Sequence, residues 1–392
     1  MSSPKISLKN PLLLLAVWLF FTQSFQWITF NRIRLTEADK KDCDTRISCL
    51  RFNPHPLDFL QMHTRQDSEW YFNIAYQGYS FSPDQQSNTN FFPLYPVLMK
   101  LVYPLLVPFT PGLTLYFRFL LSGVLISLVS LSLAIPLLYR LLARESDPDT
   151  ALLSVFLLLA FPVSYFLTAV YSESLFLLLI VLFFYCLRNQ KFFLAGIAGL
   201  FAALTRSVGL FLIIPLGMEL FRYLRSSQRK SILLYLPLLL IPLGSGIFST
   251  YLYARFHRPL AFIEAADNWG RRPGMITSLS TQFRQALNFS SSSAANYYLE
   301  IFYLLFGLAS VFLLLKSRRP EWTVWSVISV IFPLTTGVLV SQPRYTLVLF
   351  PIFFAWAGFL KSRPLPQYLY LLVSLALLGM HTVLFVNGHW SF

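Results

Sequence analysis

Long apolar runs separated by short polar segments follow one another along almost the whole chain. The first runs from about residue 11 to residue 30, and similar stretches recur up to the last residues of the sequence. A helix needs roughly 20 mostly apolar residues to cross the hydrocarbon core of a bilayer. We therefore predict an all-α integral membrane protein with about eleven transmembrane helices.

Basic residues after the apolar runs predict which ends of the helices lie in the cytoplasm. Lys5 and Lys9 precede the first run, which is long and lacks a small-residue cleavage site, so we interpret it as a retained anchor with a cytoplasmic N-terminus. Loops rich in Lys and Arg stay on the cytoplasmic side. We assign these basic positions to that side: Arg140, Arg144, Arg188, Lys191, Arg222, Arg225, Arg229, Lys230, Lys316, Arg318, Arg319, Lys361 and Arg363.

These assignments predict how the runs between the basic sites are divided. Residues 151–187 must cross twice and turn near 171–174, and residues 192–221 must form two short helices that turn at 205–209. The segment 91–109 contains four prolines and is predicted to be interfacial or re-entrant, because a full crossing would reverse every later loop. The whole chain, 1–392, is predicted to be one multispanning domain, with an extracytoplasmic loop at 31–112 that carries the catalytic segment.

Several polar and charged side chains that the orientation of the basic loops does not explain are predicted on one membrane face. We expect these side chains outside the cytoplasm: Asp67, Glu173, Arg206, Trp269, Arg271 and Arg344. Charged groups at membrane depth are costly and tend to face a cavity or a partner. This face is therefore the predicted functional face.

Composition agrees with the membrane prediction and narrows the partners. The chain is 56% hydrophobic and 12% charged, with a mean hydropathy of +0.58, which excludes a water-soluble domain. Orientation explains the net charge of +14 better than a nucleic-acid partner does, although membrane lipid will interact with the basic loops. Cys43 and Cys49 would pair if their loop faces an oxidising compartment, whereas Cys186 lies in an apolar run.

Carboxylates and arginines on one face suit a reaction that deprotonates a hydroxyl while a phosphate leaves. Asp67 is the candidate catalytic base, and Arg344 and Arg206 are the candidate ligands of a donor phosphate, because the Arg fork matches phosphate oxygens. We expect substrate contacts from Glu69, Trp70, Tyr71, Asn90, Glu173, Trp269, Arg271 and Tyr345. The chain has no Walker-type loop and no zinc-protease motif, so neither a nucleotide donor nor a metal is predicted.

Structural roles compete with these functional roles. Asp67 would also serve as a helix N-cap, and Glu69 as a solvated acid of the first turn. Arg206 would also pair with Glu173 or reach the lipid headgroups. Arg271 and Arg272 would also bind lipid headgroups. His55 and His63 have no third ligand in the pattern and are interpreted as ordinary loop residues.

Several motifs in order resemble those of the PIG-V-type mannosyltransferases (GPI mannosyltransferase 2-like), which belong to the C-type glycosyltransferase superfamily. They are Asp67-x-x-x-Tyr71-x-x-Ile74-Ala75-x-x-Gly78-Tyr79, Asn90-Phe-Phe-Pro-Leu-Tyr-Pro96, Tyr171-Ser-Glu-Ser-Leu-Phe176, Thr205-Arg206-Ser-x-Gly209, Pro259-Leu-Ala-Phe262 with Trp269, and Arg344-Tyr345 before Phe350-Pro351. The resemblance implies an inverting transferase that uses a polyprenyl- or dolichyl-phosphate sugar, usually mannose, with Asp67 as its base. The chain departs from the family at Gln66, where an aromatic residue, often Trp, is usual.

The acceptor and the compartment stay open at this stage. A glycolipid, a glycan or a protein hydroxyl are all compatible with the motifs, and so is a sugar other than mannose. We expect a bacterial plasma membrane with an extracytoplasmic site, with the endoplasmic reticulum as the alternative. The rival function is a transporter or flippase of a lipid-linked sugar, although no internal repeat between the two halves supports it.

Overall fold

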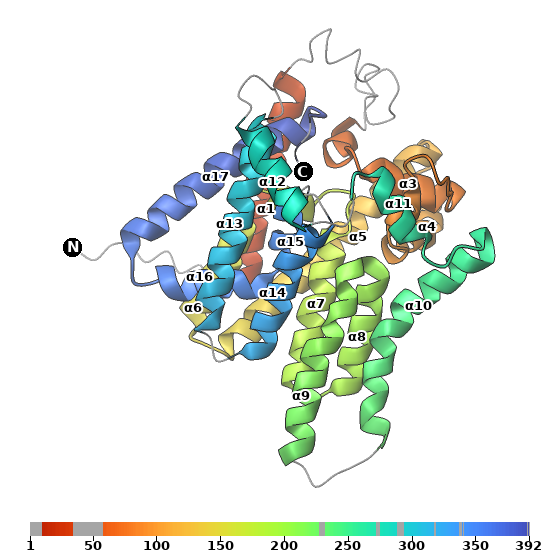
Figure 1. The fold of residues 1–392 in the computed structure, drawn as a ribbon. Coiled ribbons are helices and arrows are strands. Elements are labelled where there is room, and N and C mark those ends of the chain that lie inside the picture. The colour runs from red at the N-terminus through yellow and green to blue at the C-terminus, as the bar shows by residue number, and fades with distance from the viewer. Residues whose placement is uncertain are drawn as a thin grey trace.

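The computed structural model describes residues 10–33, 58–226, 232–271, 275–287, 294–316, 319–336, 339, 341–389 and 391. Within these ranges every regular element is a helix, which confirms the predicted all-α class (Figure 1). Cys43, Cys49, His55 and Arg272 lie outside the described residues. The elements are α1 (Pro11–Arg32), η2 (Asp58–His63), α3 (Ser68–Gln77), η3 (Asn88–Asn90), α4 (Leu94–Leu106), η4 (Val107–Phe109), α5 (Leu115–Ala143), α6 (Pro148–Leu159), η5 (Ser164–Leu167), α7 (Glu173–Arg188), α8 (Phe192–Thr205), η6 (Ser207–Leu212), α9 (Ile213–Ser226), η7 (Ile232–Tyr235), α10 (Leu236–Phe256), α11 (Ala261–Asn268), α12 (Met275–Ala286), α13 (Ala294–Leu315), α14 (Pro320–Thr335), α15 (Gln342–Leu347), α16 (Phe350–Leu360) and α17 (Pro364–Val386).

Six described segments are long and apolar enough to cross a bilayer: α1, Leu115–Ala143, Ser207–Ser226, α10, Asn296–Leu315 and α17. Several further apolar helices are shorter, and the count of about eleven crossings stays a prediction. The helix α4 has 13 residues, so it rises about 20 Å and is shorter than a bilayer core of about 30 Å. The interfacial or re-entrant path of 91–109 stays a prediction, because α6, α8 and α16, in runs predicted to cross, are about as short.

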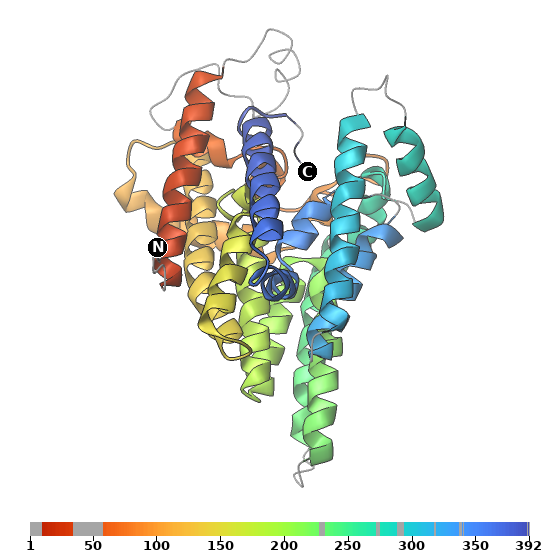
Figure 2. The ribbon, with the colours of Figure 1, turned by 90° about the vertical axis from the view of Figure 1, so that its left-hand side faces the viewer.

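The helices α7, α8, α9 and α10 lie side by side and reverse direction where the loop signs predict (Figure 1). One end of this bundle contains the start of α7 at Glu173 and the end of α8 at Thr205. On another side of the molecule, α1 packs beside α17, so the first and last helices of the chain are neighbours (Figure 2). The reversals bring Glu173 and Arg206 to the same end.

Ion pairs join helix ends at the opposite end of the bundle. Glu145, after α5, has a wholly buried carboxylate that pairs with Arg188 of α7 at 2.6 Å and with Arg319 before α14. Arg222 of α9 pairs with Glu321 of α14 at 3.1 Å. Arg188, Arg222 and Arg319, which were assigned to the cytoplasmic side, therefore lie at this end of the bundle, whereas Arg229, Lys230 and Arg318 lie outside the described residues.

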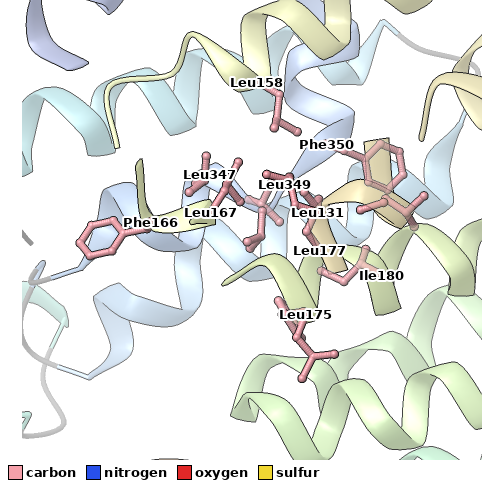
Figure 3. Packing of buried hydrophobic residues seen from close by; sticks show 14 of the residues in the cluster. Leu131, Leu158, Phe166, Leu167, Leu175, Leu177, Ile180, Leu347, Leu349 and Phe350 are labelled. Atoms are coloured by element: carbon pink, nitrogen blue, oxygen red, sulfur yellow. The ribbon is translucent and has the colours of Figure 1, made fainter. Parts of the chain in front are cut away.

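The apolar core lies where α5, α6, α7 and the α15–α16 corner meet (Figure 3). Leu131, Leu158, Leu167, Ile180 and Phe350 have no exposed surface. Because lipid tails are as apolar as leucine, these contacts stabilise the fold through close packing and dispersion more than through removal from water. The core supports α15, a short helix that carries two of the predicted site residues.

Glycines allow the backbones of α8 and α10 to approach closely. A Cβ atom on Gly196 would lie 2.9 Å from the carbonyl oxygen of Pro237, and one on Gly244 would lie 2.4 Å from that of Leu200. Small residues at helix interfaces permit this approach in membrane proteins. The interface positions α8, whose last turn leads directly to Arg206.

Gly244→Ala should therefore destabilise the protein, because the added methyl group collides with backbone that cannot move independently. Overpacking of this kind costs about 1–3 kcal/mol. Gly246→Ala is the matched control on the same helix, since no atom lies within 4 Å of its added Cβ. Thermal unfolding in one detergent measures both variants, and equal midpoints for the two would contradict the close approach of α8 and α10.

Candidate active site

Asp67 occupies the N-cap position of α3, but its side chain makes no capping hydrogen bond. Its Oδ2 instead accepts a hydrogen bond from Arg344 Nη1 at 2.5 Å. Its backbone N–H donates to the hydroxyl of Tyr171 at 3.1 Å, and that hydroxyl donates to the carbonyl of Arg65 at 2.9 Å. The chain thus positions Asp67 through its backbone and leaves its carboxylate directed at an arginine.

Two left-handed residues flank these groups. Gln66 has a φ of 52° just before Asp67, and Ser341 has a φ of 70° just before α15. This region is unfavourable for residues with a Cβ, and the cost is about 1–3 kcal/mol each. The side-chain amide of Gln66 donates to the carbonyl of His389 at 2.8 Å and so helps to hold the conformation. The position where the chain departs from the family that it resembles thus has a structural partner of its own.

Glu173 lies at the first position of α7 and is completely buried. Its Oε1 accepts from Arg206 Nη1 at 2.8 Å and from Arg344 Nε at 2.7 Å. The expected pairing of Arg206 with Glu173 is confirmed. We name Asp67, Glu173, Arg206 and Arg344 the Glu173 network; its two cations and two carboxylates balance, which a set of buried ions requires.

Aromatic rings enclose the two arginines of this network. The Arg206 guanidinium lies 4.9 Å from the ring centre of Tyr345, and that of Arg344 lies 4.7 Å from Tyr171 and 5.0 Å from Phe166. Cations over ring faces are stabilised by about 0.5–2 kcal/mol. The rings therefore help to hold the two guanidinium groups in one arrangement.

A cavity of about 340 Å³ opens beside the network. Of the predicted residues, those on its wall are Asp67, Tyr71, Asn90, Arg206, Trp269, Arg271, Arg344 and Tyr345. Glu173 lies behind the arginines, and Glu69 and Trp70 are not on the wall. Among the described residues, Asp67 is therefore the carboxylate that the cavity exposes, with 19% of its side chain accessible.

Aromatic side chains form one wall of the cavity. Trp269 meets Phe91 edge to face, with 5.8 Å between ring centres, and Trp70 packs behind both rings. Tyr71 lies on the same helical face as Asp67, and its hydroxyl donates to Ser172 Oγ at 3.0 Å. Flat apolar faces with a few polar groups between them are typical of sites for small ligands.

Trp269 and Arg271 are positioned by a capped helix end. The α11 helix ends at Asn268 in a Schellman motif: Gly270 is left-handed at a φ of 75°, its N–H donates to Asp267 O, and the N–H of Arg271 donates to Ala266 O, both at 3.0 Å. The Asn268 amide donates to two carbonyls of the segment 83–85, at 2.7 and 2.9 Å. Arg271 is therefore held against the loop that carries the aromatic wall.

Tyr345 contacts two of the arginines in the cavity. Its hydroxyl accepts from Arg271 Nη1 at 3.3 Å, and its ring faces Arg206. Burial alone would raise the pKa of this phenol, but the charges of Arg271 and Arg206 outweigh burial and lower the pKa to about 8. A tyrosine in this range is a strong hydrogen-bond donor at neutral pH.

Some wall residues were not predicted. Ile263 and Ala266 of α11 and Phe332 and Thr336 at the end of α14 join the cavity. They are apolar or small and carry no chemical signal in the sequence; only their place next to outer loops could have indicated them.

The described residues contain no group of three or more His, Cys, Asp or Glu side chains that could hold a metal. Burial lowers the pKa of His63 to about 4.

A family model for mannosyltransferases of the PIG-V type matches residues 56–256, which is more than half of the chain. No curated protein matches the chain in sequence. The matched segment contains Asp67, Glu173 and Arg206, whereas Arg271 and Arg344 lie beyond it.

Solved structures resemble the chain at low sequence identity, and ArnT shows a similar fold. ArnT from Cupriavidus metallidurans bound to undecaprenyl phosphate is 13% identical, with a TM-score of 0.51, over 94% of this chain and 63% of that one. The Archaeoglobus fulgidus oligosaccharyltransferase in its apo form is also 13% identical, with a TM-score of 0.49, over 99% of this chain and 57% of that one. The chain therefore spans less than two thirds of the length of these enzymes.

Glu173→Gln should destabilise the protein strongly, because it leaves two buried arginines with one charged partner between them. Removing one partner of a buried ion pair costs about 3–5 kcal/mol. Glu264→Gln is the control, since Glu264 pairs with Arg258 at the surface, where such pairs contribute about 0–1 kcal/mol. Thermal unfolding compares the two; similar midpoints would show that Glu173 is not the centre of the network.

The phenol of Tyr345 should ionise near pH 8, well below the ordinary range of tyrosine near 10. Its lowered pKa stabilises the folded state fully above pH 10 and contributes nothing once the pH falls below about 8. Tyrosinate absorbance during a pH titration should show one early step that is absent in Tyr345→Phe. An identical titration of the variant would contradict the charge effect of Arg271 and Arg206.

Proposed function

The chain belongs to the PIG-V mannosyltransferase family, and from this membership we propose that it transfers one hexose, mannose, from a polyprenyl- or dolichyl-phosphate carrier to a hydroxyl acceptor. The observation that carries the proposal is the cavity, where one carboxylate and several arginines meet at one end of a membrane bundle. ArnT, which is similar in fold, has been solved bound to undecaprenyl phosphate, and this supports a polyprenyl phosphate as the carrier of the donor sugar.

The proposed reaction is a single displacement at the anomeric carbon. Asp67 accepts the proton of the acceptor hydroxyl while the oxygen forms a bond to C1 of the sugar. The bond between C1 and the phosphate oxygen breaks, and the lipid phosphate leaves with an additional negative charge. The cationic wall stabilises that charge where it develops, in a site partly shielded from water.

The ion pair between Asp67 and Arg344 links the base to the phosphate. Arg344 is on the cavity wall, and its Nη1 is shared between Asp67 and any anion that enters. An incoming phosphate competes for this nitrogen and loosens its hold on the carboxylate, which then accepts the acceptor's proton. Arg344 remains fixed by Glu173 through Nε during this exchange.

The site is proposed to face away from the cytoplasm. The basic segments gather at the opposite end of the bundle, and loops rich in Lys and Arg favour the cytoplasmic side. A lipid-linked donor suits an extracytoplasmic site because nucleotide sugars are not available there. A bacterial plasma membrane, or the endoplasmic reticulum, is the proposed location, and the acceptor is a hydroxyl of a glycolipid, a glycan or a protein.

Asp67→Asn should abolish transfer, because the amide keeps the shape of the carboxylate but does not accept the proton. Loss of a general base lowers the rate by about 10²–10⁴-fold. Asp84→Asn is the control: Asp84 is exposed in the loop after α3 and does not line the cavity. The assay measures mannose incorporation and carrier release from polyprenyl-phosphate mannose, with membranes of a deletion strain as the source of acceptor.

Near wild-type transfer by Asp67→Asn would refute Asp67 as the base. Wild-type protein that moves the labelled lipid between leaflets without forming a glycosidic bond would refute the transferase and favour a flippase.

A further inference from the structure

We propose that the phosphate of the lipid carrier binds first to Arg271, in a corner of the cavity that Arg271 shares with Tyr345 and Arg206. The inference rests on the proposed function and makes its donor site more specific. It also differs from the expectation that Arg344 and Arg206 alone hold the phosphate. Arg271 and Tyr345 lie beyond the segment that the family model matches.

The charges around the cavity leave one arginine without a carboxylate. Three arginines line the wall, and two carboxylates, Asp67 and Glu173, both belong to the Glu173 network. The balance is three positive minus two negative charges, which leaves one positive charge. Arg206 and Arg344 are paired in the network, and no described Asp or Glu lies within 4.0 Å of the Arg271 side chain. The excess charge therefore belongs to Arg271.

An arginine before the same helix has a different environment. Arg258, in the connection between α10 and α11, pairs with Glu264 at 3.0 Å and is more than half exposed. Arg271 instead is half-buried, lines the cavity and uses Nη1 to hold a neutral phenol. A cation that faces a cavity with only a neutral partner is suited to an anionic ligand.

Tyr345 completes the corner with a donor of a different kind. Its hydroxyl lies 3.3 Å from Arg271 Nη1, and its ring lies 4.9 Å from the Arg206 guanidinium. The same arginines lower the pKa of the phenol to about 8, although its burial opposes this, so its proton is a good hydrogen-bond donor to a phosphate oxygen. Two guanidinium groups and one phenol can therefore share one phosphate.

The corner is built before a ligand arrives. The Schellman motif at Gly270 fixes the backbone of Arg271, and the Asn268 amide fastens α11 to the segment 83–85. Such preorganisation reduces the conformational entropy that the protein loses when a ligand binds. The aromatic wall adjoins Arg271 through Trp269, so a phosphate in this corner places the attached sugar next to the rings.

Binding of undecaprenyl phosphate to the purified protein in detergent tests the assignment without requiring turnover. Tryptophan fluorescence follows the titration, and undecaprenol serves as the uncharged control ligand. Arg271→Gln should weaken the affinity for undecaprenyl phosphate about tenfold or more, as expected for loss of a charge-assisted contact, and leave that for undecaprenol unchanged. Arg271→Lys keeps the charge without the fork and should fall between wild type and Arg271→Gln. The matched control, Arg258→Gln, should bind undecaprenyl phosphate like wild type.

Wild-type affinity in Arg271→Gln, or a loss confined to Arg344→Gln, would overturn the proposal. Competition separates the possible sources of the phosphate. Phosphatidylglycerol micelles or inorganic phosphate that displace undecaprenyl phosphate at equal concentration would show a general anion site and would also overturn it. If Arg271 governs the binding of undecaprenyl phosphate while the wild-type protein transfers no sugar, the inference stands and the proposed function fails. If the wild-type protein transfers sugar but Arg271→Gln binds undecaprenyl phosphate with wild-type affinity, the proposed function stands and the inference fails.

Discussion

The site depends on one buried carboxylate, Glu173, which holds two arginines from different parts of the chain. Its Oε1 accepts from Arg206 at 2.8 Å and from Arg344 at 2.7 Å, at a depth where water does not screen the charges. A buried ion without partners would cost several kcal/mol, so the three side chains can be buried only together. Arg344 then extends the pairing to Asp67, and this step connects the buried network with the cavity.

Short helices make this arrangement possible within a membrane fold. The helices α7 and α8 have 16 and 14 residues, fewer than the roughly 20 that cross a bilayer core, and Glu173 at the start of α7 is buried within the protein. Non-helical backbone at membrane depth is tolerated where protein or a cavity surrounds it. The close contact of α8 with α10 and the core beneath α15 hold these helix ends in place, and aromatic rings pack against the arginines.

The sequence was sufficient to predict the fold class and the end of the bundle at which Asp67, Glu173, Arg206 and Arg344 meet, because apolar length and loop charge are local properties. Glu69 and Trp70 were expected to contact substrate, but neither is on the cavity wall. The ion pair between Arg344 and Asp67 joins residues that are far apart in the chain, and no periodicity reports such a contact. The sequence indicated Arg271 only as one substrate contact among several, because no pattern along the chain reports that no described carboxylate pairs with it. The left-handed Gln66 likewise depends on its contact with His389.

The stereochemistry of transfer tests the central claim most directly. The cavity exposes one carboxylate among the described residues, Asp67, while Glu173 is buried behind the arginines, so the carboxylate can serve as a base but no second one is placed for a double displacement. The measurement is the anomeric configuration of the mannosyl product formed by purified protein from polyprenyl-phosphate mannose of known configuration. We expect the configuration opposite to that of the donor. A product that retains the donor's configuration would contradict it.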